Sequence, residues 1–437
     1  MAVLTTGVVF LGPSSAHPGN LAEEDGYKRA AARSIVMRAI AGDALEARAS
    51  AAVTVPTEGP APCVNGLAGT YPCDGIDMMS RLSLADLGLT FGNDSWGWTD
   101  PETGRDYALM GGSEGVAVVD ISSPTRPDVV GFLPTFTTAG GDFWRDIKVY
   151  QNHMYVVSEN TGHGLQVLDL TQVRGISGPP VTFSETAHYT GFGNAHNINI
   201  NEDTGFLYAI GSNTCAGGLH MVDISSPASP VSAGCFADHG YIHDTQCVVY
   251  EGPDTDHRGN EICFNSNNTT AGGSFNALSI VDVSDKSNPV ALAKMGYTNA
   301  GYSHQGWLSA DQRFFLHGDE LDELFHGIPT TTRVWDVRDL DNPVVANVFA
   351  NTTTSIDHNL YTEGRAAYAS NYTSGLRVYD LRGLPNLTER AFFDVYPEND
   401  NASFEGGTWS NYGFYNRSRI VTVSSIDRGL FILRTRG

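Results

Sequence analysis

The segment GVAVVDISSPTRP, residues 115–127, sets the pattern for most of this chain. It joins a β-rich run to an aspartate and a turn that contains proline. The pattern recurs as GLHMVDISSPASP (218–230), ALSIVDVSDKSNP (277–289), TTRVWDVRDLDNP (331–343) and GLRVYDLRGLPN (375–386), with a weaker copy GLQVLDL (164–170) and a truncated copy GLFILRTRG (429–437). A unit repeated this often indicates a fold built from equivalent parts.

The aspartates mark equivalent positions at intervals of 44–59 residues, and Arg434 takes the place in the last copy: Asp120, Asp169, Asp223, Asp282, Asp336 and Asp380. Two short strands are expected before each copy and one after it. Each repeat therefore contains four strands, with an aspartate that accepts hydrogen bonds in the turn and a proline that ends pairing. The sequence predicts an all-β fold, a seven-bladed β-propeller with four-stranded blades over residues 63–437.

The last copy has no fourth strand after it. Residues 80–88 (SRLSLADLG) form an extra strand before the first repeat. We expect this N-terminal strand to complete the last blade, which closes the ring and removes two open sheet edges.

The segment before the propeller divides into two parts. Residues 1–20 are read as a signal or leader segment because residues 3–12 are apolar, although no Lys or Arg precedes them. Residues 21–62 are predicted to be a short helix (21–52) followed by a Pro-rich linker (53–62). No other segment reaches the ~18 apolar residues of a transmembrane helix.

Charge and cysteine content restrict the partners and the compartment. The formal net charge of -23 repels phosphate backbones, so nucleic acid is excluded as a partner. Six cysteines permit 15 disulfide pairings, and their clustering favours Cys63–Cys73, Cys215–Cys235 and Cys247–Cys263. Disulfides indicate an extracellular or secreted protein, or a cell-surface or periplasmic one.

The repeat resembles the LVIVD repeat, and the chain from Cys63 to Gly437 resembles the choice-of-anchor B family. The resemblance rests on CVNGLAGTYPCDGIDMMSRL (63–82), WGWTDPETGRDYAL (96–109), WRDIKVYQNHMYVVSE (144–159), ETAHYTGFGNAHNI (185–198), YIHDTQCVVYEGPDTDHRGNEICFNS (241–266), YSHQGWLSADQRFF (302–315) and IDHNLY (356–361). It implies an extracellular bacterial propeller, and it implies no catalytic role. Family members typically carry C-terminal anchors; because the last copy here runs to Gly437, we expect release, or attachment through the N-terminal segment.

Four successive innermost strands are predicted to begin with a histidine: His196, His243, His304 and His358. Asp146 is assigned to the matching position of the second blade, and Asp244 and Asp357 flank two of the histidines. Innermost strands line the channel of a propeller, so these side chains converge although they are far apart in sequence. Imidazole and carboxylate suit Zn²⁺, Fe²⁺ or Mn²⁺. The alternative is a water-filled polar channel whose histidines bond to the neighbouring backbone.

The segment HGDELDELFH (317–326) is a second candidate. Asp319, Glu320, Asp322 and Glu323 offer the oxygen ligands that Ca²⁺ prefers, without the spacing of an EF-hand. The alternative is a solvated acidic loop.

Three functions remain open at this point. The first is an extracellular binding module for a protein, glycan or small molecule, with or without a channel metal. The second is a metal-dependent hydrolase that uses the histidines, with Asp146 or Asp244 as ligand or general base. The third is a structural surface or matrix component. The sequence contains no GxSxG, HExxH, P-loop or Rossmann motif, and it does not decide whether the protein is an enzyme.

Overall fold

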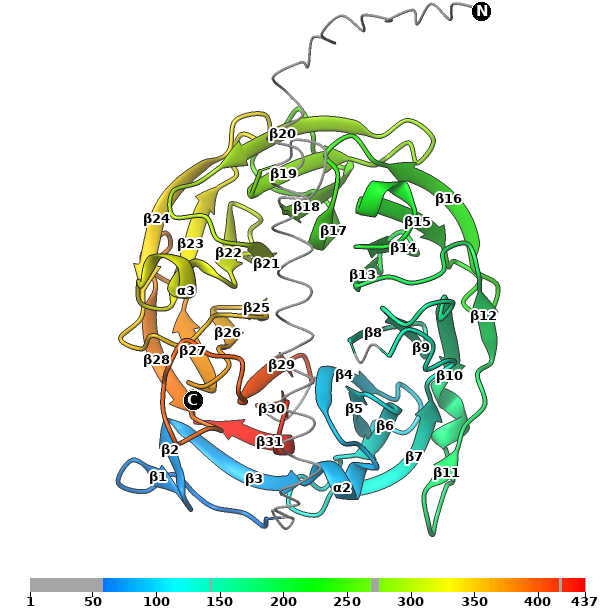
Figure 1. Ribbon diagram of the computed structural model, residues 1–437, viewed down its shortest axis with the longest axis vertical. Helices are drawn as coiled ribbons and strands as arrows, with labels where there is room; N and C mark the ends of the chain where they lie inside the picture. The colour runs from blue at the N-terminus through cyan, green and yellow to red at the C-terminus, as the bar shows by residue number, and fades with distance from the viewer. Residues whose placement is uncertain (1–57, 142–143, 269–274, 416–418, 437) are drawn as a thin grey trace, which may run out of the picture.

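Seven β-sheets surround a common centre in the computed structural model (Figure 1). The structure describes residues 58–141, 144–268, 275–415 and 419–436. The seven-bladed propeller with four-stranded antiparallel blades is confirmed. The leader (1–20) and the helix (21–52) expected from the sequence lie outside the described residues.

Each blade begins at the channel and ends at the rim. From inside to outside, blades 1 to 4 consist of β4 (Gly92–Thr99), β5 (Asp106–Gly112), β6 (Gly115–Asp120) and β7 (Asp128–Pro134); β8 (Arg145–Tyr150), β9 (His153–Ser158), β10 (Leu165–Asp169) and β12 (Ala187–Tyr189); β13 (Asn197–Asn201), β14 (Phe206–Ile210), β15 (Leu219–Asp223) and β16 (Val231–Phe236); and β17 (Ile242–Val249), β18 (Glu261–Asn267), β19 (Ala277–Asp282) and β20 (Val290–Gly296). A short strand, β11 (Val181–Thr182), adds to β7 in parallel.

Blades 5 to 7 follow the same plan. They consist of β21 (Ser303–Leu308), β22 (Phe314–Asp319), β23 (Thr331–Asp336) and β24 (Val344–Ala350); β25 (Leu360–Glu363), β26 (Ala366–Ser370), β27 (Leu376–Asp380) and β28 (Thr388–Phe393); and β29 (Thr408–Tyr412), β30 (Ile420–Ser425), β31 (Gly429–Thr435) and β3 (Ile76–Leu82). The short helical segments of the described chain are α2 (Leu84–Leu87), α3 (Asp322–His326), η1 (Leu170–Val173) and η2 (Cys215–Gly217).

The repeat aspartates act in the turn after the third strand. Each accepts a hydrogen bond from the backbone N–H two residues later, which replaces the strand pairing lost at the turn. The distances are 2.9–3.1 Å at Asp120, Asp169, Asp223, Asp282, Asp336 and Asp380. This bond explains why the sequence pattern recurs.

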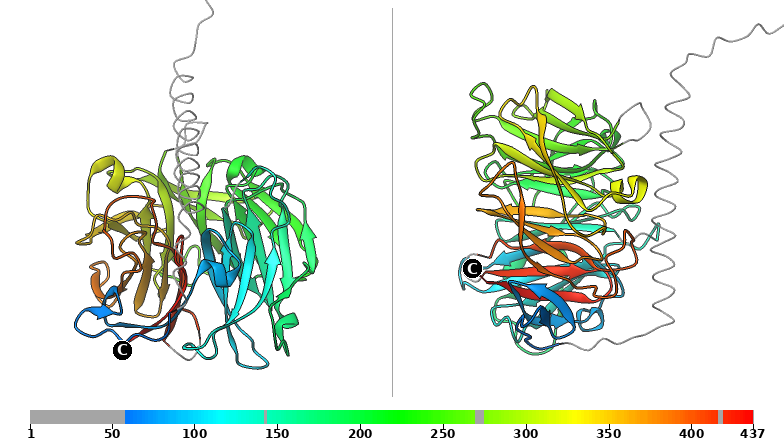
Figure 2. Two further views of the ribbon diagram at one scale, coloured as in Figure 1. Left: turned by 60° about the horizontal axis from the view of Figure 1, so that its bottom comes forward. Right: turned by 90° about the vertical axis from the view of Figure 1, so that its left-hand side faces the viewer.

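The ring closes between the two ends of the propeller. β3 pairs antiparallel with β31, so an N-terminal strand completes blade 7, and both views show the N-terminal strands against the C-terminal ones (Figures 1 and 2). The expected bounds of 80–88 are wrong, because β3 ends at Leu82 and α2 follows. Ser83 and Asp86 cap this helix reciprocally, and Gly88 ends it with φ 72°.

Blade 6 also receives N-terminal strands. β2 (Tyr71–Asp74) pairs with β28, and β1 (Leu67–Ala68) pairs with β2. The disulfide Cys63–Cys73 fixes this hairpin. The first 25 described residues therefore cover the rims of two neighbouring blades.

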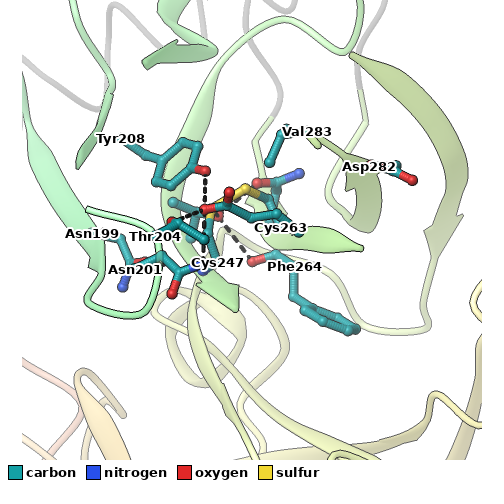
Figure 3. Close-up of a disulfide and its surroundings, with 12 residues drawn as sticks. Asn199, Asn201, Thr204, Tyr208, Cys247, Cys263, Phe264, Asp282 and Val283 are labelled. Carbon is teal, nitrogen blue, oxygen red and sulfur yellow. Dashed lines mark hydrogen bonds between the residues drawn. A yellow bond between two sulfur atoms is a disulfide. The ribbon is translucent and has the colours of Figure 1, made fainter. Parts of the chain in front are cut away.

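All three expected disulfides are present. Cys247 and Cys263 are directly opposite each other on β17 and β18 (Figure 3). Beside this bridge, Glu261 accepts a hydrogen bond from Tyr208 of blade 3 at 2.5 Å and pairs with Lys286 at 2.7 Å. Disulfide and ion pair together hold blades 3 and 4 at this level.

No described helix is long and apolar enough to cross a membrane.

Candidate metal centre

Aromatic and imidazole rings form an arc at the end of the channel where the innermost strands begin. Successive ring centroids are 4.1–4.7 Å apart in the order His196, His243, His304, His358, Trp409 and Trp144. The four histidines therefore meet, as predicted, but they stack in a row and do not surround one point. Among the described residues, no ligand group within metal-binding distance contains all four.

Two of the histidines share one carboxylate oxygen. The Nε2 atoms of His304 and His358 are 3.9 and 3.8 Å from Oε1 of Glu320, and the ligand atoms of all three residues lie within 4.8 Å of one another. Each of the three side chains is at most 4 % exposed. Two imidazoles and one carboxylate are a common ligand set for zinc and other transition metals.

The separations fit coordination better than hydrogen bonding. They exceed the limit of a hydrogen bond. Two ligands each ~2.1 Å from a tetrahedral zinc are about 3.4 Å apart, so the Glu320 oxygen and each imidazole would approach by about 0.4 Å. Small side-chain rotations supply such a shift.

Neighbouring groups orient the three ligands. Nδ1 of His358 donates to the carbonyl of Trp409 at 2.5 Å, which leaves Nε2 as the acceptor atom facing Glu320. Tyr372 donates its hydroxyl hydrogen bond to Glu320 Oε1 at 2.8 Å. Such outer partners fix ligand orientation in metal sites.

Tyr372 was not identified from the sequence. It is fully buried, it packs against the His358 ring with centroids 5.0 Å apart, and its φ is 29°. A bulky residue with positive φ is strained, and strain of this kind concentrates at functional sites. No motif in the sequence marks this position.

The role of Glu320 follows from the hairpin geometry of a blade. The second strand runs antiparallel to the first, so the residue that follows it lies where the first strand begins. Glu320 follows β22 and reaches His358 of the next blade; Glu159 follows β9 and reaches His196 of the next blade at 2.5 Å. An acidic residue immediately after a second strand was the signal available in the sequence.

Asp146 does not belong to this arc. The residue immediately before the inner strand of blade 2 is Trp144, so the assignment of Asp146 to the histidine position is wrong. Asp146 lies inside β8, where it accepts a hydrogen bond from Ile198 N at 2.7 Å and pairs with Lys148 at 2.7 Å. It joins blade 2 to blade 3.

Asp146 forms part of what we call the lysine cluster: Asp94, Asp146, Asp244 and Lys148. Lys148 is also 3.7 Å from Asp94 and lies over the ring of Trp96 at 4.6 Å. Burial, reinforced by the charge of Asp146, raises the pKa of Asp244 to about 7, and burial likewise raises the pKa of Asp94. Among the described groups, neither Asp146 nor Asp244 joins the histidines as a metal ligand.

The acidic segment 317–326 divides among three roles. Glu320 faces the histidines. Asp319 accepts hydrogen bonds from Tyr297, Gly301, Tyr302 and Leu321 at 2.5–3.2 Å and stabilises the local turn. Asp322 and Glu323 lie with Asp357, and we call these three residues the carboxylate cluster. The four acidic residues are buried, so the alternative of a solvated loop is wrong.

A cavity of about 240 Å³ lies where the innermost strands end, opposite the histidines. Its walls include Trp96, Trp98, Tyr412, Phe414 and Glu202. Trp96 packs edge-on against Tyr412 with centroids 5.0 Å apart. These aromatic residues mainly bury one another between blades 1 and 7.

Comparison with known families identifies the repeat. Residues 105–135, 193–238 and 273–295 match the model of the LVIVD repeat. This chain carries LVIVD repeats. The matched segments contain three of the copies recognised in the sequence, at 115–127, 218–230 and 277–289.

Solved structures provide distant similarities. The β-propeller domain of Cps50 (Swd1) from Myceliophteria thermophila is 12% identical, with a TM-score of 0.49, covering 78% of this chain and 95% of that one. A chain of a Nidogen/Laminin complex is 10% identical, with a TM-score of 0.41, covering 65% and 92%. Comparison with curated proteins found no match.

Proposed function

We propose that this protein is an extracellular propeller of the choice-of-anchor B type that binds its ligand through a divalent transition metal held by His304, His358 and Glu320. The observation that carries the proposal is the pair of imidazole nitrogens 3.8 and 3.9 Å from one buried carboxylate oxygen. The three disulfides support an oxidising, extracellular location.

The ligand set indicates what such a metal would bind. Three protein ligands leave at least one coordination position for water or another oxygen ligand. Because the three side chains are buried, only a narrow group reaches the ion, such as a terminal carboxylate of a peptide or a hydroxyl of a glycan. Zn²⁺, Fe²⁺ and Mn²⁺ all accept two imidazoles and a carboxylate.

Metal analysis tests the proposal. Purified protein, stripped and reloaded with Zn²⁺, is expected to retain about one equivalent after desalting, measured by elemental mass spectrometry. Glu320→Gln keeps the acceptor for Tyr372 but removes the charge. It is expected to weaken binding roughly 100-fold, since losing even an outer partner of a metal site costs 10–100-fold.

His196→Gln is the matched control. His196 belongs to the same arc but bonds to Glu159 and not to Glu320. This variant is expected to retain the metal. Equal zinc retention by Glu320→Gln and the parent, or no retention by the parent, contradicts the proposal.

Hydrolysis is the second candidate function, because a metal with an open position also activates water. Neither Asp146 nor Asp244 serves as its base, since both lie in the lysine cluster. Zinc-dependent turnover of nitrophenyl esters or phosphates, lost in Glu320→Gln, would favour the hydrolase over the binding module.

A further inference from the structure

The carboxylate cluster brings together acidic side chains from two blades. Asp322 and Glu323 are in α3, between the second and third strands of blade 5, and Asp357 lies in the segment that enters blade 6. One oxygen from each residue lies within 4.8 Å of the others. Their exposed fractions are 0, 3 and 4 %.

Most of the oxygens in this cluster have no hydrogen-bond donor. Asp322 Oδ2 pairs with Arg333 at 2.7 Å, and Glu323 Oε1 accepts from Thr331 N at 3.2 Å. Asp322 Oδ1, Glu323 Oε2 and both oxygens of Asp357 have no hydrogen-bond partner among the described groups. Buried carboxylates are normally hydrogen-bonded, so four such oxygens facing one another require an explanation.

The backbone makes room for Asp357. A Cβ at position 318 would lie 2.2 Å from Asp357 Oδ2. Gly318 therefore allows the carboxylate to lie directly against the second strand of blade 5. The fold accommodates a charged group at a position where an apolar side chain would be simpler to bury.

The charge balance indicates a missing cation. The cluster holds three carboxyl groups beside one guanidinium, that of Arg333, which is committed to the far oxygen of Asp322. Buried charges are stable only when they are paired or coordinate a metal.

The oxygen ligands and their spacing select the ion. Ca²⁺ takes oxygen ligands at about 2.4 Å, so two ligands on opposite sides of it are about 4.8 Å apart. Mg²⁺, with bonds of about 2.1 Å and a strict octahedron, demands a tighter cluster.

We infer that Asp322, Glu323 and Asp357 form a calcium site that joins blade 5 to blade 6. The ion would tie α3 to the chain entering β25. This site is independent of the histidine centre, because its ligands are different residues and contain no nitrogen.

Calcium titration of the whole chain tests the inference. After chelation and desalting, the parent is expected to bind one equivalent of Ca²⁺ by calorimetry and to gain a few degrees in Tm. Asp357→Asn is expected to weaken calcium binding roughly 100-fold, because calcium affinity depends on ligand charge. Glu323→Gln provides a second variant, and the parent titration requires no variant at all.

Two controls separate this site from other effects. Asp394→Asn changes another buried aspartate whose pKa burial raises to about 6, and it is expected to bind calcium like the parent. His304→Ala/His358→Ala is expected to lose zinc but keep calcium, whereas Asp357→Asn keeps zinc. Absence of calcium binding by the parent, or unchanged binding by both Asp357→Asn and Glu323→Gln, overturns the inference.

Discussion

The lysine cluster and the carboxylate cluster are both groups of three carboxyl side chains near the channel, but they are neutralised differently. Lys148 lies between two carboxylates of the first cluster, at 2.7 Å from Asp146 and 3.7 Å from Asp94. In the second cluster, Arg333 contacts one oxygen at the edge. One oxygen of the first cluster lacks a described hydrogen-bond partner, compared with four in the second.

This difference separates a structural cluster from a binding one. A cluster with its own cation joins neighbouring blades and has no need of an external ion. A cluster without one carries excess negative charge in a medium of low dielectric constant, which favours proton or cation uptake. Burial and the charge of Asp357 accordingly raise the pKa of Glu323 to about 12 in the metal-free protein.

Removal of Lys148 tests the first half of the comparison. Lys148→Met leaves three carboxyl groups without their cation, and we expect the free energy of unfolding to fall by about 3–5 kcal/mol, the usual cost of breaking a buried ion pair. Urea denaturation measures it. Arg313→Met, which breaks a largely exposed pair with Asp311, is expected to cost no more than about 1 kcal/mol. Equal losses in both variants would contradict the comparison.

The pH dependence of stability tests the same cluster. Burial and the charge of Asp146 raise the pKa of Asp244 from 3.8 to about 7, against Lys148, His196 and the Thr245 N–H, which lower it. Between these values the folded state binds a proton that the unfolded state releases, so the free energy of unfolding falls as pH rises.

Asp244→Asn should remove that contribution. The full shift corresponds to about 4 kcal/mol between pH 4 and 7, and partial exposure reduces the expected change to about 3 kcal/mol. Denaturation of parent and variant at several pH values measures the difference. Parallel pH profiles would show that Asp244 is ionised throughout this range in the folded protein.

Gly318→Ala sharpens the second half of the comparison. The added Cβ would lie 2.2 Å from Asp357 Oδ2, and we expect a loss of about 1–3 kcal/mol as for other overpacked sites, together with weaker calcium binding. Gly59→Ala, where nothing lies within 4 Å of the added Cβ, should change stability by less than about 0.5 kcal/mol. A Gly318→Ala protein as stable as the parent would place Asp357 elsewhere.

The fold was predictable because its information is local and repeated. The aspartate of each copy bonds to an amide two residues away, so one short motif reports the whole turn. The end of β3 was harder to place, because SRLSLADL alternates well enough for a strand. The reciprocal bonds between Ser83 and Asp86 decide for a helix at residue 84.

The candidate site was only half predictable. The histidines were visible because they recur at strand starts, and the structure brings them together. The choice of His304 and His358 depends on Glu320, which crosses from one blade to the next. Asp357 appeared only as a neighbour of His358, since its contact with Asp322 and Glu323 joins residues 34 or more positions apart. Contacts between blades leave no periodic trace in a sequence.

The closing strand gives synthesis an unusual order. Arg81, in β3, donates a hydrogen bond to the carbonyl of Arg428, 347 residues later, just before β31. At roughly 5–20 residues per second, the ribosome needs roughly 20–70 s to make the chain between them. Throughout that interval β3 has emerged without its partner strand, and an unpaired strand edge readily pairs with other chains. Crowded ribosomes on one message are therefore where this propeller is most exposed to misassembly.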